Sequence, residues 1–162
     1  MFSSANKAAR ACKRVARPSF SFYRFADEDA MSRIEIVRNG VPATVLPELV
    51  AALHLPKEQI VRGIGIPMAT SNRRLRSRES FNPSESERIV GLVQLLARVD
   101  RWAHARGDAL EDGFDPEAWL GEWLTTPNRA LGGHPPLSLL DTADGRALVG
   151  AVLESMETGA YW

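Results

Sequence analysis

Apolar residues recur every three or four positions over most of this chain, which is the spacing of amphipathic helices. The first such helix is predicted at about residues 44–53, with Thr44 as its N-cap. A short helix follows at about residues 57–63, and after a glycine-containing turn Pro67 begins a third helix that ends near Arg78. A short helix, a turn and a basic helix together form the layout of a helix-turn-helix.

A longer helix is predicted next, because Ser84 and Glu87 have the spacing of a capping box. The Phe81-Asn82-Pro83 segment separates it from the basic helix, and residues 107–113 follow it as a loop. Its apolar stripe makes it a central packing helix and consists of Ile89, Leu92, Val93, Leu96, Val99 and Ala103.

The last third of the chain predicts a compact helical unit. Asp115 caps a helix that begins at Pro116 and stops before Pro127, because proline disfavours helical geometry in the residue that precedes it. A final helix is capped by Thr142 and ends at Gly159. The stripe that this last helix is expected to bury consists of Leu148, Val149, Val152, Leu153 and Met156.

The N-terminal region has a different pattern. Residues 33–38 alternate between polar and apolar side chains, which predicts a short strand or extended segment ended by Asn39-Gly40. Residues 1–32 are basic and rich in serine, and we interpret them as a flexible arm. The arm is either a tail without a specific role or a segment that grips phosphates or a partner, and its composition also resembles an organellar transit peptide. The chain is therefore expected to be all-α, with an arm at 1–32, a helix-turn-helix and central helix at 33–106, and a small helical domain at 107–162.

The charges are unevenly distributed, although the formal net charge is zero. Residues 1–24 hold six Lys and Arg residues and no acid, and residues 59–78 hold five Arg residues and no acid. Beyond Gly107, ten acidic residues are accompanied only by Arg129 and Arg146. One end of the chain should therefore attract polyanions, and the other end should repel them.

The basic helix suits DNA recognition. Arg and Asn side chains can present paired hydrogen-bonding groups to base edges in the major groove, and further Arg and Thr groups can hold phosphates. The alternative is that an Arg-rich helix is an ordinary solvated surface. The residues expected at the DNA are Met68, Thr70, Asn72, Arg73, Arg74 and Arg76.

No catalytic or metal-binding pattern stands out. Cys12 is the only cysteine, so the chain offers neither an intramolecular disulfide nor a cysteine zinc site, which suits a reducing cytosol. His54, His104 and His134 are far apart and outside any metal-ligand spacing, and no phosphate-binding loop or complete dinucleotide fingerprint is present. No apolar run has the length of a membrane span. We expect a cytoplasmic protein that is not an enzyme and uses no cofactor or metal.

The order of residues in the last third resembles a known family. Its elements are Trp119 and Trp123, Pro127-Asn128, Ala130-Leu131, Gly132-Gly133, Pro135-Pro136 and the segment from Asp141 to Gly145. This order is similar to the toxin-binding domain of the Xre/MbcA/ParS antitoxins. Thr70 followed by Arg73-Arg74 resembles the Xre-like helix-turn-helix of the same family, although Ser71 stands where an apolar residue is usual. The resemblance spans roughly residues 40–162 and implies an antitoxin.

The resemblance also implies a partner. Many antitoxins of this family accompany RES-domain toxins, which degrade NAD, so the partner should carry a positively charged cleft that the acidic C-terminal region complements. The terminal Tyr161-Trp162 either enters this cleft as an aromatic anchor or packs on its own domain. The residues expected at the toxin are Trp119, Trp123, Asn128, Leu131, Gly132, Glu154, Glu157, Tyr161 and Trp162.

The helix-turn-helix would then bind the operator of the chain's own operon, as a homodimer within a toxin–antitoxin hetero-oligomer. A different class of function stays open, namely a dimeric helix-turn-helix regulator without a toxin partner, and an adaptor role is a third. Salt-sensitive binding to an operator together with no affinity for a toxin would favour the regulator.

Overall fold

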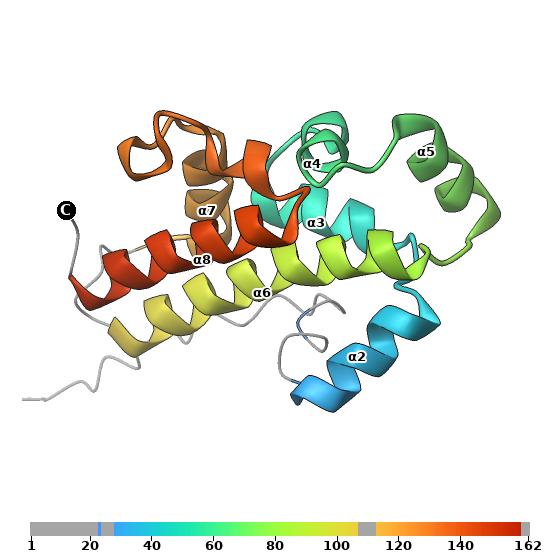
Figure 1. The fold of residues 1–162 in the computed structure, drawn as a ribbon, viewed down its shortest axis with the longest axis horizontal. Coiled ribbons are helices and arrows are strands. Elements are labelled where there is room, and N and C mark those ends of the chain that lie inside the picture. Colours follow the sequence, from blue (N-terminus) through green and yellow to red (C-terminus); the bar gives the residue numbers. More distant parts are fainter. Residues whose placement is uncertain (1–22, 24–27, 107–112, 160–162) are drawn as a thin grey trace, which may run out of the picture.

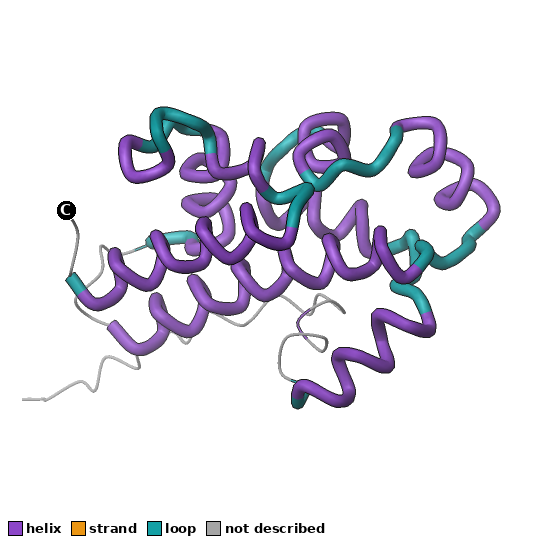
Figure 2. The backbone as a smooth tube through the Cα atoms, viewed as in Figure 1, coloured by secondary structure: helices purple, strands orange, loops and turns teal. Residues whose placement is uncertain are grey.

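The computed structural model describes residues 23, 28–106 and 113–159, and helices dominate this part of the chain (Figure 2). No strand occurs among these residues, where the sole β pairing is an isolated bridge between Pro42 and Ser80. The all-α expectation is therefore confirmed. The elements are α2 (Ala30–Asn39), α3 (Val45–Leu53), α4 (Lys57–Gly63), α5 (Met68–Ser77), α6 (Pro83–Arg106), α7 (Pro116–Thr125), the 3-10 turns η2 (Arg129–Leu131) and η3 (Pro136–Leu139), and α8 (Ala143–Thr158).

The long helix α6 is the axis of the fold (Figure 1). Helices α2, α7 and α8 pack directly on it, while α3 packs on α7, and α4 contacts both α5 and η3. The apolar side chains of α6 recur at helical spacing and are buried, as the sequence predicts. The fully buried members include Ile89, Leu92, Val93 and Leu96.

The helix-turn-helix and the C-terminal unit share one hydrophobic core. Two glycines allow the closest approaches between them. A Cβ atom on Gly121 would lie 2.0 Å from the carbonyl oxygen of Leu53 at the end of α3, and one on Gly63 would lie 2.4 Å from the Cγ atom of Leu137. Backbone-to-backbone contact of this kind ties α7 to α3, so the two regions should unfold together.

Replacing Gly121 tests this shared core. In Gly121→Ala the new methyl group meets backbone atoms of α3, which cannot move aside as a flexible side chain would. We expect the free energy of unfolding, measured by urea denaturation, to fall by about 1–3 kcal/mol. The control is Gly150→Ala in α8, where an added Cβ meets no atom within 4 Å. That control should gain up to about 1 kcal/mol from helix propensity, and equal effects of the two changes would contradict the packing described.

The strand or extended segment predicted at residues 33–38 is wrong, because this segment lies in helix α2. Asp29 caps the helix, since its carboxylate accepts hydrogen bonds from the backbone N–H groups of Met31 and Ser32. The partly buried Ile36 and Val37 pack against the core. Helix α2 thus begins at Ala30, inside the segment interpreted as an arm.

The predicted helix caps are right where the cap is local and polar. Asp115 and Thr142 both accept backbone hydrogen bonds at the starts of α7 and α8. Thr44 precedes α3 as expected, but its hydroxyl makes no capping hydrogen bond.

The capping box predicted for Ser84 and Glu87 is wrong. The box joins Asn82 and Glu85, whose side chains accept each other's backbone N–H at 2.8 and 2.9 Å, and α6 begins at Pro83 between them.

Tyr23 shows that part of the predicted arm belongs to the core. Its side chain is buried, and its hydroxyl donates a hydrogen bond to Glu117 Oε1 of α7 at 2.5 Å. Residues 1–22 and 24–27 lie outside the described residues. Within the described part, no helix is both long and apolar enough to cross a membrane.

Candidate functional site

Helix α5 presents a polar surface after the turn that follows α4. Gly65 has a φ of +67° in this turn, while Ile64 and Ile66 on either side are buried and hold it to the core. On α5, Asn72, Arg73 and Arg76 are exposed and Thr70 is partly exposed. Met68 differs, because it is partly buried and packs against the core. The predicted DNA-contacting side chains therefore do not all face solvent.

Asn72 has a partner that the sequence reasoning missed. Its Oδ1 accepts a hydrogen bond at 2.6 Å from the Nζ of Lys57, the first residue of α4. The ammonium group of Lys57 thus lies beside the exposed polar surface of α5. It adds a cation beside Asn72 on a helix where Arg73 and Arg76 are also exposed.

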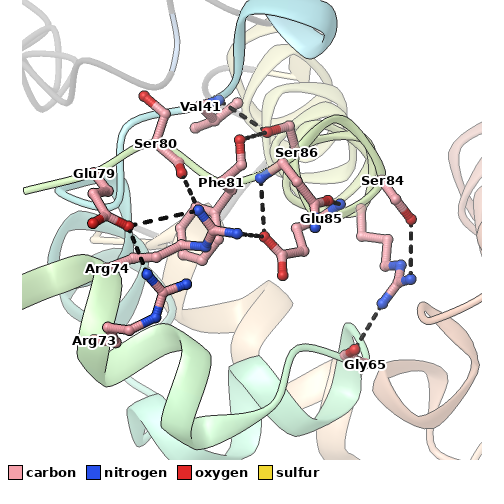
Figure 3. A network of polar contacts seen from close by, with 12 residues as sticks. Val41, Gly65, Arg73, Arg74, Glu79, Ser80, Phe81, Ser84, Glu85 and Ser86 are labelled. Atoms are coloured by element: carbon pink, nitrogen blue, oxygen red, sulfur yellow. Dashed lines mark hydrogen bonds and ion pairs between the residues drawn. The ribbon is translucent and has the colours of Figure 1, made fainter.

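Arg74 turns toward the protein, as Figure 3 shows. Its guanidinium lies 3.1 Å from the Glu85 carboxylate, donates to the carbonyl oxygen of Ser80 at 2.6 Å, and sits 5.7 Å from the centroid of the Phe81 ring. The side chain is only 15% exposed. Arg74 therefore joins α5 to the start of α6, and its main contacts are intramolecular.

Arg73 has a looser environment. It pairs with Glu79 at 3.0 Å, but its side chain is 55% exposed, so the pair is weak and screened by solvent. Ser71, the departure from the family pattern, is fully buried, and its hydroxyl has no hydrogen-bond partner within the described part of the chain. The polar atom at this apolar position is a local weakness in the packing of α5.

The second candidate surface is a groove of about 900 Å³ between α7, the turn that follows it, and α8. The residues that line this C-terminal groove are Trp123, Thr126, Pro127, Asn128, Arg129, Ala130, Leu148, Ala151, Val152, Ser155 and Met156. Leu148 is 49% exposed, so its assignment to the buried stripe of α8 is wrong. Helix α8 buries Val149, Val152 and Leu153, which leaves Leu148 on its outer side.

The turn that walls this groove is held by Asn128. Its Oδ1 accepts the backbone N–H of Ala130 at 2.9 Å, and its backbone carbonyl accepts the N–H of Gly133 at 2.8 Å. Leu131 is buried and Gly132 adopts a φ of +65°. Asn128, Leu131 and Gly132 were all predicted at the toxin, and all three shape this turn. Of these three Asn128 lines the groove, as does the predicted Trp123.

The two tryptophans of α7 stack on each other, with ring centroids 6.2 Å apart and planes at 12°. Trp119 also lies 5.8 Å from Trp102 of α6 and 6.3 Å from Phe114. Trp119 is thus part of an intramolecular aromatic cluster, whereas Trp123 forms an edge of the C-terminal groove.

The acidic end of α8 is partly neutralised. Glu154 and Glu157 lie 3.3 and 3.5 Å from the guanidinium of Arg98 on α6, although both carboxylates stay largely exposed. The sequence could not show these pairs, because Arg98 is more than fifty positions away. Tyr161 and Trp162 lie outside the described residues.

Glu117 has an unusual environment for a carboxylate. Burial raises its pKa above the ordinary 4.5, and the hydrogen bond from Tyr23 opposes this by favouring the ionised form. An acid whose pKa is raised in the folded chain stabilises the fold when protonated. Its contribution is present below pH 4.5 and is lost as the pH rises through the raised value.

Glu117→Gln should therefore flatten the pH dependence of stability. Glutamine keeps an acceptor for the Tyr23 hydroxyl but cannot ionise. We expect the free energy of unfolding of the wild type, followed by urea denaturation, to decrease from acidic toward neutral pH by about 1.4 kcal/mol for each unit of pKa shift. The variant should lose this slope, and Glu122→Gln on the exposed side of α7 should keep it. A wild-type slope that survives in Glu117→Gln would contradict the assignment.

Within the described part of the chain, no three His, Cys, Asp or Glu side chains are grouped to hold a metal ion. The two surfaces above are suited to binding: α5 offers exposed hydrogen-bonding groups, and the C-terminal groove offers apolar area beside a rigid turn.

Two family descriptions match the chain. Residues 109–159 match the antitoxin Xre/MbcA/ParS C-terminal toxin-binding domain, and residues 32–94 match the antitoxin Xre-like helix-turn-helix domain. The first match contains α7, the turn and α8, and the second runs from the third residue of α2 through α5 to the first half of α6. The expected order, a helix-turn-helix followed by a toxin-binding domain, is confirmed.

Relatives that align over three quarters or more of the chain agree with these matches. The chain is 31% identical over 153 residues to the Prs ADP-ribosylating antitoxin of Sphingobium sp. (strain YBL2), which covers 94% of this chain and 95% of the relative. It is 30% identical over 129 residues to antitoxin Xre of Yersinia enterocolitica, covering 79% and 80% of the two chains. It is 29% identical over 124 residues to antitoxin Xre of Photorhabdus laumondii, covering 76% and 77%.

Proposed function

Because the chain belongs to the Xre/MbcA/ParS antitoxin family, we propose that it neutralises an NAD-consuming toxin by docking its C-terminal groove on that enzyme and covering the active site. The observation that supports this most strongly is the groove itself. Trp123 and the turn that contains Pro127 and Asn128 line it, and all of them lie within the matched toxin-binding domain. Leu148 stands half exposed within it, as an apolar contact that a partner would bury.

The chemistry of the toxin is the finer part of the proposal. The family resemblance suggests a RES-domain enzyme that degrades NAD. The Sphingobium relative carries ADP-ribosylation in its name, and ADP-ribose is ordinarily transferred from NAD. Both reactions begin with NAD in a cleft, so blocking entry of the dinucleotide would stop either one.

The acidic charge of the C-terminal domain also supports docking of this domain at the active site of the toxin. Exposed acids lie on the same C-terminal domain as the groove, among them Glu122 on α7 and Asp144 in the first turn of α8, while Arg98 offsets Glu154 and Glu157. A cleft that binds a dinucleotide diphosphate is positively charged, so the acidic domain would be drawn to its mouth and would compete with substrate.

We also propose that α5 binds the operator of the chain's own operon in the cytoplasm, as a dimer. Asn72, Arg73 and Arg76 are exposed on α5 and can contact DNA, with Lys57 beside them. In this proposal Arg74 positions α5 through Glu85. The chain itself would act by binding and not by catalysis.

Co-expression tests the proposal. The gene beside that of this chain is expressed as the candidate toxin, with and without this chain, while growth, cellular NAD and ADP-ribosylated protein are measured. We expect toxin alone to stop growth with either falling NAD or rising ADP-ribosylation, and co-expression to reverse both. Toxicity that co-expression leaves unchanged would reject neutralisation and favour a helix-turn-helix regulator without this toxin partner.

A further inference from the structure

A basic cavity of about 440 Å³ lies between α2, α6 and α8. In Figure 1, α2 and α8 flank the long helix α6. Among the residues that the structure describes, no acidic residue lines the cavity. The lining residues that matter here are Arg33, Gln94, Arg98, Arg101, Arg146 and Gly150. It adjoins a depression of about 480 Å³ along α2, which shares Arg33, Gln94 and Arg146 and adds the basic Arg38 and the acidic Glu87. It shares no lining residue with the C-terminal groove.

Two of these arginines are held in place by the fold. Arg146 pairs with Glu87 at 3.0 Å and donates to the carbonyl oxygen of Leu140 at 3.1 Å. Arg98 pairs with Glu154 and Glu157. The cavity thus has two fixed guanidinium groups whose positions need no reorganisation when a ligand arrives.

The other two are less engaged. Arg33 donates to the backbone carbonyl of Glu28, and Arg101 is exposed. Neither has a carboxylate within ion-pair distance among the residues that the structure describes. The cavity therefore keeps an excess of positive charge that an anion would neutralise.

Gly150 supplies an independent observation. It lies inside α8, where glycine is less favourable than alanine by about 1 kcal/mol, yet an added Cβ would meet nothing within 4 Å. Gly91 in α6 is different, because its Cβ would lie 2.5 Å from the Cδ of Arg146. A clash explains Gly91 but not Gly150, which lines the cavity and whose carbonyl oxygen accepts a hydrogen bond from Arg98 Nη1 at 3.3 Å. The missing side chain lets the Arg98 guanidinium, and a ligand beside it, approach the backbone closely.

We infer that this cavity binds a phosphate-bearing anion, with a diphosphate as the best match to Arg33 and Arg101, which have no ion pair among the described residues, beside the ion-paired Arg98 and Arg146. A guanidinium group can donate two parallel hydrogen bonds to the oxygens of a phosphate. The volume of the cavity falls in the range of small-molecule binding sites. The diphosphate can belong to a free nucleotide, or two phosphates of a DNA backbone can occupy the same positions. The inference rests on residues outside the toxin groove and outside α5, so it can fail while the proposed function holds.

Calorimetric titration with inorganic pyrophosphate, with ADP and with a random-sequence DNA duplex tests it. In Arg33→Gln/Arg101→Gln we expect affinity for the bound probe to fall at least about tenfold, the loss of one charge-assisted contact or more. Arg106→Gln on α6 lies outside the cavity and should bind as the wild type does. Gly150→Ala should raise the melting temperature yet weaken anion binding, a combination that a purely structural glycine would not produce.

The probes separate the two sources. Pyrophosphate or ADP binding that the cavity variants lose supports a free nucleotide. Duplex binding that the same variants weaken, without measurable pyrophosphate affinity, supports DNA phosphates. If no probe binds more weakly to the double variant than to Arg106→Gln, the inference is overturned.

Discussion

Leu148→Glu is expected to weaken binding to the toxin by at least about 30-fold, or about 2 kcal/mol, the loss typical of an interface hot spot. The side chain is half exposed in the C-terminal groove, so a partner that fills the groove would bury it. A carboxylate there would be desolvated without a partner. The free chain should keep its stability within about 0.5 kcal/mol, because the position is on the surface. Binding of purified toxin, followed by calorimetry or interferometry, gives the measurement.

Met31→Glu is the matched control for this prediction. Met31 is one of two further large apolar residues that are exposed in the described part of the chain, at 66%, but it lies on α2 and does not line the groove. The substitution brings the same charge and removes similar apolar surface. If both variants bind the toxin equally well, or both lose binding equally, the groove is not the docking surface.

Arg74→Ala is expected to lower the free energy of unfolding by about 3–5 kcal/mol, because it leaves the buried Glu85 carboxylate without its cation. It also removes the contacts that tie α5 to Ser80 and Phe81. Operator binding should be lost along with the fold of α5. Thermal unfolding and operator binding by fluorescence anisotropy measure the two effects.

Two further variants separate structure from DNA contact. Arg76→Ala removes an exposed arginine that has no ion pair among the described residues, so stability should change by less than about 0.5 kcal/mol while operator affinity falls. Arg74→Met combined with Glu85→Gln removes both charges together and should recover much of the stability that Arg74→Ala loses. A stable Arg74→Ala with weak operator binding would instead make Arg74 a direct DNA contact.

The sequence was sufficient where the determining signal is local. The stripes of α3 and α6, the proline at the start of α7, and the caps Asp115 and Thr142 all act within one or two turns of chain, so their pattern predicts the element directly. The helix-turn-helix can be predicted because the local signals for its helices and its turn follow one another along the chain. Segment 33–38 was misread because alternation dominated the pattern, while the capping residue Asp29 lies upstream of it.

The candidate sites depended on contacts between distant residues, which the pattern does not contain. The sequence pattern does not distinguish Arg74 from the other basic residues of an exposed helix. The structure shows that its guanidinium lies 3.1 Å from the carboxylate of Glu85. Leu148 fits the apolar stripe of α8 but falls on its outer side, because α6 covers only part of that stripe. Tyr23 gave no signal as a partner of Glu117, since the two are 94 positions apart. Packing sets the direction in which each side chain points. This direction decides which of the predicted residues are available to a partner.

The most direct test of the central claim is NAD consumption by the purified candidate toxin, titrated with this chain. We expect the wild-type chain to abolish turnover at concentrations comparable to that of the toxin, and Leu148→Glu to require a large excess to do so. Full turnover in the presence of excess wild-type chain, or equal inhibition by Leu148→Glu at limiting concentration, would contradict neutralisation through the C-terminal groove.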